Sequence, residues 1–216
     1  MPNWVENHIK FEDPKDAKYI LDKDENVDFN IVVPRPKSLD VVSGSSNDYA
    51  IYVYLSNKML IPLPDVKKMP ESSLIKNSYS KDWIEEIYQR LQNPEVTNKN
   101  IDDYYDEGEI LVTNYHKYGY TTWYDWNCNN WGCKWNASET FKNIDENGKT
   151  VYGFSTPWGP PHHWLEALAK KHIKFTCEWI EEQGYHGIFT SVGDGNLNHK
   201  DLDMISYDYD DDDDED

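Results

Sequence analysis

Apolar and polar side chains alternate at the start of the chain, which predicts a half-buried β-strand over residues 3–11. One side of this strand carries Asn3, Val5, Asn7, Ile9 and Phe11, and the residues between them lie on the other side. Alternation of this kind is typical of an antiparallel sheet with one covered face and one exposed face.

Helix signals follow this strand and recur further along the chain. Asp13 and Pro14 form an N-cap and a first helical residue, which predicts a short helix. Residues 29–36 are an apolar run that prolines interrupt, so they favour an edge strand or an extended loop. Residues 49–55 fit either a strand or a helical turn, whereas residues 80–91 have the apolar spacing of a helix.

The second half of the chain carries clearer signals. Residues 121–131 are rich in aromatic side chains and predict a helix. Two predicted strands, at 134–144 and 149–156, are separated by Asn147 and Gly148. Because Asn-Gly is the strongest short-range hairpin signal, we expect these strands to pair.

A helix and further strands complete the pattern. Pro160 and Pro161 open a helix with an apolar stripe, residues 173–179 alternate as a strand, and residues 187–192 predict another. The order is strand, helix, long insertion, hairpin, helix and strand. This split β-α-β order predicts an α+β fold, in which helices cover one face of an antiparallel sheet.

Charge adds a second level of information, because the formal net charge is -19. Eight acidic residues lie in the segment 207–216, and residues 1–206 still carry a net charge of -11. We expect 207–216 to be a disordered acidic tail, because like charges repel and do not form a core. An acidic surface repels phosphates and attracts basic proteins, which argues against direct nucleic-acid binding. Acidity that only maintains solubility is the alternative.

Cysteine content and hydropathy bear on the compartment. The chain has three cysteines and begins without the basic and apolar regions of a secretory signal. No apolar run approaches the roughly 20 residues of a membrane span. We therefore expect free thiols, no membrane partner and a cytoplasmic location.

Three separated motifs carry a resemblance to a known family. They are residues 1–7 (MPNWVEN), residues 123–137 (WYDW at the start and NWGCKWNA at the end) and residues 154–161 (FSTPWGPP). Together they resemble the YubB-type ferredoxin-like domain family of phages and plasmids, over roughly residues 1–33 and 120–190. The resemblance implies a ferredoxin-like sheet, a mobile-element origin and action inside a bacterial host cell. It supplies no catalytic residue, and Cys133 stands where the family pattern leads us to expect Thr.

The resemblance also sets the expected domain organisation. A single ferredoxin-like domain spans residues 1–206, with a long insertion at about 34–119, and residues 207–216 follow as the tail. The insertion and the tail lie outside the resemblance, so their roles are argued from their residues alone.

Cysteines and histidines are the candidates for catalysis or metal binding. Cys128 and Cys133 lack the spacing of common zinc modules, and the adjacent His162 and His163 should point about 100° apart on a helix. A nucleophilic Cys133 needs a lowered pKa, whereas burial among aromatic residues raises it. We therefore expect no metal, no cofactor and no catalytic site. A small enzyme that uses Cys133 or the pair His162 and His163 is the alternative.

The tryptophans between residues 123 and 135 have two interpretations. Trp126, Trp131 and Trp135 either fill the core or form an exposed platform for a partner or a nucleic-acid base. Base stacking is usually accompanied by several basic residues, and only Lys134 is near. We therefore favour the core.

An acidic cluster inside the insertion is the candidate binding surface. Its carboxylates imitate the charge of a row of phosphates, and its tyrosines offer contact area of the kind enriched in interfaces. A solvated loop is the alternative. The candidate partner-binding residues are Asp102, Asp103, Tyr104, Tyr105, Asp106, Glu107 and Glu109.

These observations predict a protein that acts by binding. We expect a phage or mobile-element protein that binds and inhibits a basic, nucleic-acid-handling host defence protein, such as a CRISPR effector, through acidic DNA-mimicking surfaces. An accessory structural or regulatory protein without an inhibitory role is a further alternative.

Overall fold

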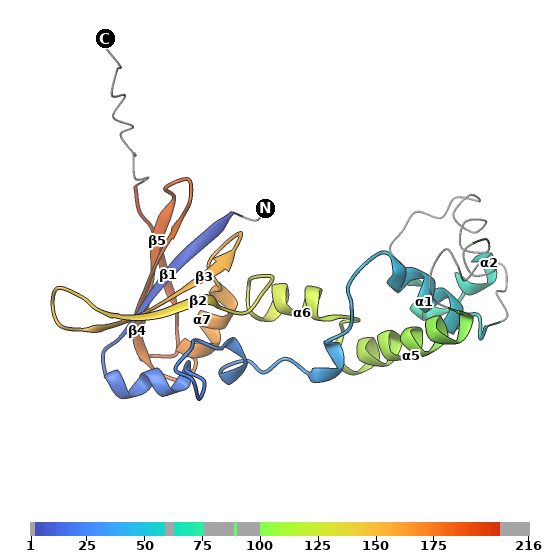
Figure 1. Ribbon diagram of the computed structural model, residues 1–216, viewed down its shortest axis with the longest axis horizontal. Helices are drawn as coiled ribbons and strands as arrows, with labels where there is room; N and C mark the ends of the chain where they lie inside the picture. The colour runs from blue at the N-terminus through green and yellow to red at the C-terminus, as the bar shows by residue number, and fades with distance from the viewer. Residues whose placement is uncertain (1–2, 59–62, 76–88, 90–99, 204–216) are drawn as a thin grey trace, which may run out of the picture. The chain divides into compact units, whose positions relative to one another are not determined.

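The computed structural model describes residues 3–58, 63–75, 89 and 100–203 (Figure 1). The chain divides into two compact units. Unit 1 comprises Met1–Pro34 and Asn127–Asp216, and unit 2 comprises Arg35–Trp126, close to the segment expected as an insertion. Over the described residues, no helix is both long enough and apolar enough to cross a bilayer.

Unit 1 is built on a six-stranded sheet in the order β2-β3-β1-β4-β5-β6. Every neighbouring pair is antiparallel, and β1 is central, with β3 on one side and β4 on the other. The elements of unit 1 are β1 (Trp4–Phe11), η1 (Pro14–Tyr19), η2 (Phe29–Ile31), β2 (Ser138–Ile144), β3 (Thr150–Pro157), α7 (His162–Ala169), β4 (Lys174–Glu181), β5 (His186–Val192) and β6 (Asn198–Asp201). The predicted α+β fold is confirmed.

Burial alternates along β1, as expected for a half-buried strand. Val5, Asn7, Ile9 and Phe11 are all buried, and the residues between them are at least partly exposed. Figure 1 shows α7 beside the sheet, and the apolar residues of this helix are buried. The sheet therefore has a covered face and an open face.

Phe29 lies at the centre of the core of unit 1 and is fully buried. Its ring centroid is 4.6 Å from that of Trp164 and 5.7 Å from those of Trp131 and Phe154. Four aromatic rings from distant parts of the chain thus meet, and aromatic side chains supply much of the apolar burial in this unit.

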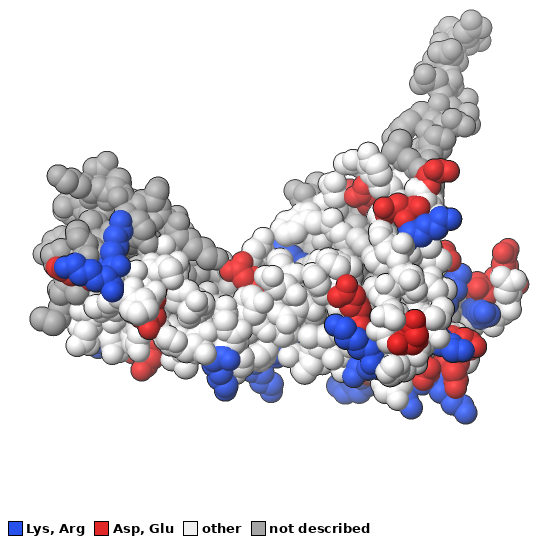
Figure 2. Space-filling view, turned by 180° about the vertical axis from the view of Figure 1, so that it is seen from behind, with Lys and Arg blue, Asp and Glu red and all other residues white. Residues whose placement is uncertain are grey.

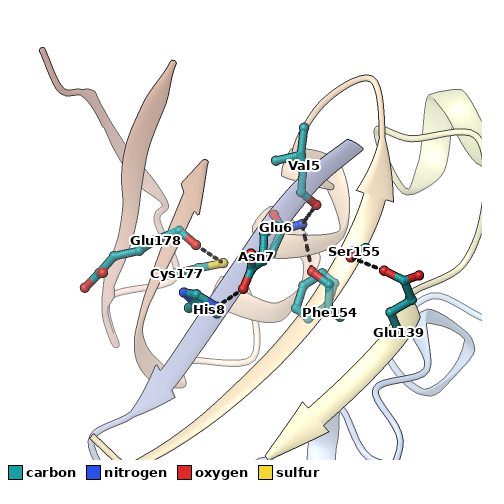
Figure 3. Close-up of polar contacts among 9 residues, drawn as sticks. All are labelled: Val5, Glu6, Asn7, His8, Glu139, Phe154, Ser155, Cys177 and Glu178. Carbon is teal, nitrogen blue, oxygen red and sulfur yellow. Dashed lines mark hydrogen bonds and ion pairs between the residues drawn. The ribbon is translucent and has the colours of Figure 1, made fainter. Parts of the chain in front are cut away.

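A buried asparagine joins β1 to β3. The Asn7 side-chain nitrogen donates to the carbonyl oxygens of Val5 (3.0 Å) and Phe154 (3.3 Å) and to the Thr156 hydroxyl (2.8 Å). Figure 3 shows Asn7 between Val5 and Phe154. Burial of the amide nitrogen is tolerated because it is hydrogen-bonded within the sheet.

The segment at 29–36 is not an edge strand. Phe29–Ile31 form the 3-10 helix η2, and the Asp28 carboxylate caps it by accepting from the Asn30 backbone N–H at 2.9 Å. The Phe29 N–H donates to the Asn136 side chain at 2.8 Å. Local capping therefore overrides the strand preference of the apolar run.

The predicted hairpin joins β2 to β3, although β2 starts four residues later than expected, at Ser138. The Asp145 carboxylate accepts from the backbone N–H groups of Lys149 (2.8 Å) and Asn147 (3.0 Å), and these bonds lower the pKa of Asp145. Gly148 adopts φ 76°, so only the glycine of the Asn-Gly pair needs a left-handed backbone.

The described part of unit 2 is helical. Its elements are η3 (Lys37–Leu39), α1 (Ser46–Leu55), α2 (Leu63–Val66), η4 (Pro70–Leu74) and α5 (Ile101–Tyr118), and α6 (Trp123–Asn130) spans the boundary with unit 1. The segment 49–55 is therefore helical. The helix predicted at 80–91 lies outside the described residues, apart from Gln89.

Candidate functional site

The acidic cluster lies on a helix, α5, and the alternative of a solvated loop is wrong. Asn100 caps the helix: its side-chain oxygen accepts from the Asp103 N–H at 2.8 Å, and the Asp103 carboxylate accepts from the Asn100 N–H at 3.2 Å. Such a capping box satisfies two backbone donors at the helix start. Gly119 ends the helix at φ 78°.

Helical spacing separates the cluster into two faces. Tyr104, Gly108, Leu111 and Val112 are buried, and the first three follow the i, i+4, i+7 pattern of one helix face. Asp102, Asp106 and Glu109 follow the same spacing on the opposite face, and all three are exposed. Three of the predicted carboxylates therefore share a solvent-facing stripe, which we call the α5 acidic face.

One member of this face has a basic partner. The Lys58 ammonium lies 2.5 Å from the Asp102 carboxylate and 4.6 Å from the centroid of the Tyr105 ring. The hydrogen bond with Asp102 and the charges of Asp102 and Asp106 raise the pKa of Lys58. Within the described part of the chain, Asp106 and Glu109 form no ion pair.

The two tyrosines of the cluster are placed differently from the prediction. Tyr104 is buried, and its ring centroid is 6.4 Å from that of Tyr49, so it belongs to the core of unit 2. Tyr105 is half-buried, with its ring centroid 5.2 Å from that of Tyr54. Glu107 accepts a hydrogen bond from the Asn47 side chain at 3.3 Å. Of the predicted interface tyrosines, Tyr104 is not accessible to a partner.

Acidic charge outside the tail is not concentrated in unit 2. Residues 35–126 contain 14 acidic and 10 basic side chains, whereas residues 1–34 and 127–206 contain 18 and 11. The face of the molecule seen in Figure 2 carries acidic and basic side chains interspersed. The α5 acidic face is therefore one of several acidic regions, and unit 1 contributes the larger excess of negative charge.

The thiols do not have the setting of a nucleophile. Cys133 is buried, its thiol donates to the Trp135 carbonyl oxygen at 3.2 Å, and burial raises its pKa. Cys177 lies on β4, next to β1 (Figure 3), and its burial raises its pKa as well. Because the thiolate is the reactive form, neither environment favours nucleophilic attack.

His162 and His163 do not point apart as expected. Their ring centroids are 3.8 Å apart, with 40° between the ring planes. Gly132 lies against them, since a Cβ at this glycine would be 2.9 Å from His162 Nδ1. Burial, and then the charge of His163, lower the pKa of His162. No group of three or more His, Cys, Asp or Glu side chains within the described residues has the arrangement of a metal site.

The tryptophans of the central motif divide between core and surface. Trp126 and Trp131 are buried, which agrees with the core interpretation. Trp135 is exposed, and the Lys134 ammonium lies over its ring and over that of Trp158, from the third sequence motif, which is exposed as well. Sequence patterning did not identify Trp158 because it follows a strand and has no periodic partner.

A groove of about 570 Å³ lies where β1 ends and β4 begins. Lys10 and Lys174 line it, and both lie beside carboxylates: Lys10 is 3.5 Å from Asp145, and Lys174 is 3.3 Å from Glu12. Lys149 also lines the groove, so its lining holds three lysines and one glutamate, and the ion pairs with Asp145 and Glu12 offset the charges of Lys10 and Lys174.

Comparisons with known proteins address the fold. Residues 130–216 match the family model of the ferredoxin-like domain in Api92-like protein. The crystal structure of protein api92 from Yersinia pseudotuberculosis is similar at 11% identity and a TM-score of 0.42, over 96% of this chain and 100% of that chain. No curated protein matches. Residues 130–216 are thus similar to the ferredoxin-like domain of Api92-like proteins, and the described part of this segment contains β2 to β6 and α7.

Proposed function

We propose that this protein acts by binding a basic, nucleic-acid-handling protein of a bacterial host, such as a CRISPR effector, and inhibits it by DNA mimicry. The proposal includes the YubB-type resemblance and the phage or plasmid origin that it implies. Binding, rather than catalysis, is the activity that we assign to it.

The charge density of α5 carries the proposal. The three carboxylates of the α5 acidic face, Asp102, Asp106 and Glu109, span seven residue steps of about 1.5 Å each, which gives about one negative charge per 3.5 Å. One strand of duplex DNA presents one negative charge per about 3.4 Å of the helix axis. A groove that accommodates a row of phosphates would therefore meet a similar charge density on α5.

The α5 acidic face also lies on a rigid helix. Its helix is capped at both ends and packed against α1 through a buried face, so the exposed carboxylates are held on a rigid element. A preorganised surface loses less conformational entropy on binding than a mobile loop. This difference favours an interaction surface over a purely solubilising one.

The test begins with capture of a partner from a bacterial lysate on the immobilised full chain, followed by measurement of its Kd. We expect a basic nucleic-acid-binding protein that duplex DNA displaces, with a Kd that rises steeply between roughly 50 and 200 mM salt.

Asp106→Asn with Glu109→Gln should then weaken binding by about two- to fivefold per charge removed, because each lost ion pair is worth up to about 1 kcal/mol. Asp203→Asn with Glu146→Gln removes the same charge from exposed positions in unit 1 and is the matched control. Recovery of no basic protein, or a Kd that is insensitive to salt, would contradict the proposal.

A further inference from the structure

Three exposed or half-buried tryptophans come together on the surface of unit 1. The ring centroids of Trp4 and Trp135 are 6.0 Å apart. The Lys134 ammonium lies 4.6 Å from the centroid of Trp135 and 5.1 Å from that of Trp158. Trp135 is 38% exposed and Trp158 is 53% exposed. These residues, Trp4, Lys134, Trp135 and Trp158, form what we call the tryptophan surface.

The backbone holds this surface in place from three distant segments. Trp158 adopts φ 68°, a conformation that costs energy for a bulky side chain, and its N–H donates to the Asn3 carbonyl oxygen at 2.8 Å. Trp4 pairs with Pro157 in the sheet. The backbone that carries the exposed Trp158 ring is thus held by a hydrogen bond to the segment before β1.

Lys134 shows which chemical group the surface accommodates. Indole rings attract cations through the negative charge of their faces, and a cation that lies near two rings gains from both. Arginine stacks on aromatic rings better than lysine and is more weakly hydrated. A guanidinium group from another protein would therefore compete favourably with the Lys134 ammonium.

Carboxylates close to the tryptophan surface add charge complementarity. Glu182 accepts a hydrogen bond from the Trp4 N–H at 3.1 Å. Glu6 lies two residues from Trp4 and opposite Ser155, whose hydroxyl donates to Glu139 at 3.2 Å. Figure 3 shows Glu6, Ser155 and Glu139 on the neighbouring strands β1, β3 and β2. A cationic group that reaches the indole rings would thus meet negative charge around them.

We propose that the tryptophan surface binds arginine side chains of a basic polypeptide, and that Lys134 occupies the site in the free protein until arginine displaces it. This inference rests on the proposed function, because it assigns a recognition site for the same class of basic partner. It differs from that function in requiring aromatic contact in unit 1, which a purely electrostatic surface does not provide.

The test compares two fluorescein-labelled peptides of equal charge, one with Arg-Gly-Gly repeats and one with Lys-Gly-Gly repeats, by fluorescence anisotropy with the full chain. We expect the arginine peptide to bind about three- to tenfold more tightly, the scale of one partly exposed cation–π contact. Trp158→Asn should abolish this preference, and Asn tolerates the positive φ. Lys134→Gln should tighten binding of the arginine peptide several-fold, a gain that a misfolded variant cannot produce.

Ile144→Asn is the control, because Ile144 is 64% exposed and lies at the opposite end of β2 from Ser138. It should leave both affinities unchanged. Equal binding of the two peptides, or an arginine preference that survives Trp158→Asn, would overturn the tryptophan site. If single-stranded DNA, and not the arginine peptide, binds in a manner that depends on Trp158, the site is a base-stacking platform and the inference is wrong. None of these results decides the proposed function, which is judged on the captured partner and on Asp106 and Glu109.

Discussion

Gly108→Ala tests how closely α5 packs against α1, because this change should destabilise the helix pair, whereas Gly→Ala usually stabilises a helix. In an exposed helix, Gly→Ala stabilises by about 1 kcal/mol. At Gly108, however, a Cβ would lie 2.2 Å from the Ala50 carbonyl oxygen and 2.6 Å from the Tyr54 Cβ. The first of these atoms belongs to the backbone of α1, so the two helices have to move apart to admit the methyl group.

Overpacking costs about 1–3 kcal/mol, and an overlap with a backbone atom that cannot rotate away places the cost here at about 2–3 kcal/mol, above the gain of about 1 kcal/mol in helix propensity. We therefore expect Gly108→Ala to lower the free energy of unfolding of unit 2 by about 1–2 kcal/mol. Hydrogen exchange of the α1 and α5 amides reports on this unit specifically, and exchange in both helices should accelerate by about five- to thirtyfold.

Gly44→Ala is the matched control, since Gly44 has open space around its Cα and no left-handed backbone. It should leave exchange in α5 nearly unchanged. Slower exchange in Gly108→Ala would refute the close packing of α1 and α5. It would also remove the rigid support that we assign to the α5 acidic face.

Three further predictions concern unit 1. Phe29→Ala should lower the free energy of unfolding, measured by urea denaturation, by about 3–5 kcal/mol, because it leaves a cavity among three aromatic rings. A loss below about 1 kcal/mol would contradict that packing. Burial lowers the pKa of His162 in the folded state, so the unfolded state binds more protons and the free energy of unfolding should fall as pH drops from about 7.5 through 6.5. His162→Asn should flatten this pH dependence of the urea midpoint, and an unchanged slope would show that His162 is not its source. Cys133 and Cys177 should resist a thiol reagent in the native protein, whereas the partly exposed Cys128 should react first, as mass spectrometry of labelled peptides would show.

Parts of the fold could be predicted because local patterns and tertiary structure agree there. The alternation that includes Val5, Ile9 and Phe11 correctly indicates that β1 is a half-buried strand, and Gly148 marks the turn between β2 and β3. By contrast, β6 has four exposed residues and no alternation to reveal it. Its strand conformation comes from pairing with β5, which only the assembled sheet provides.

The candidate partner-binding residues were chosen from the sequence, but the helical conformation of the segment that contains them was not predicted. The apolar spacing of Tyr104, Leu111 and Val112 was a helix signal, but the many acids around it and Gly108 weakened that signal. Once the segment is helical, its residues divide between the core and solvent, and Tyr104 becomes inaccessible. The tryptophan surface could not be predicted, because it is formed by contacts between Trp4, Lys134 and Trp158. These residues are far apart in sequence and have no periodic relation.

The central position of β1 has a consequence for how this chain folds as it is made. Asn7 and the carbonyl of Phe154 that it contacts are 147 residues apart. At synthesis rates of about 5–20 residues per second, β1 waits roughly 7 to 30 s before its first neighbour in the sheet exists. The residues of unit 2 form a continuous stretch of chain and are complete before then. During this interval both edges of β1 are unpaired and can pair with other chains. We therefore expect the yield of folded protein to be limited by how well chaperones protect β1, more than by the stability of the finished sheet.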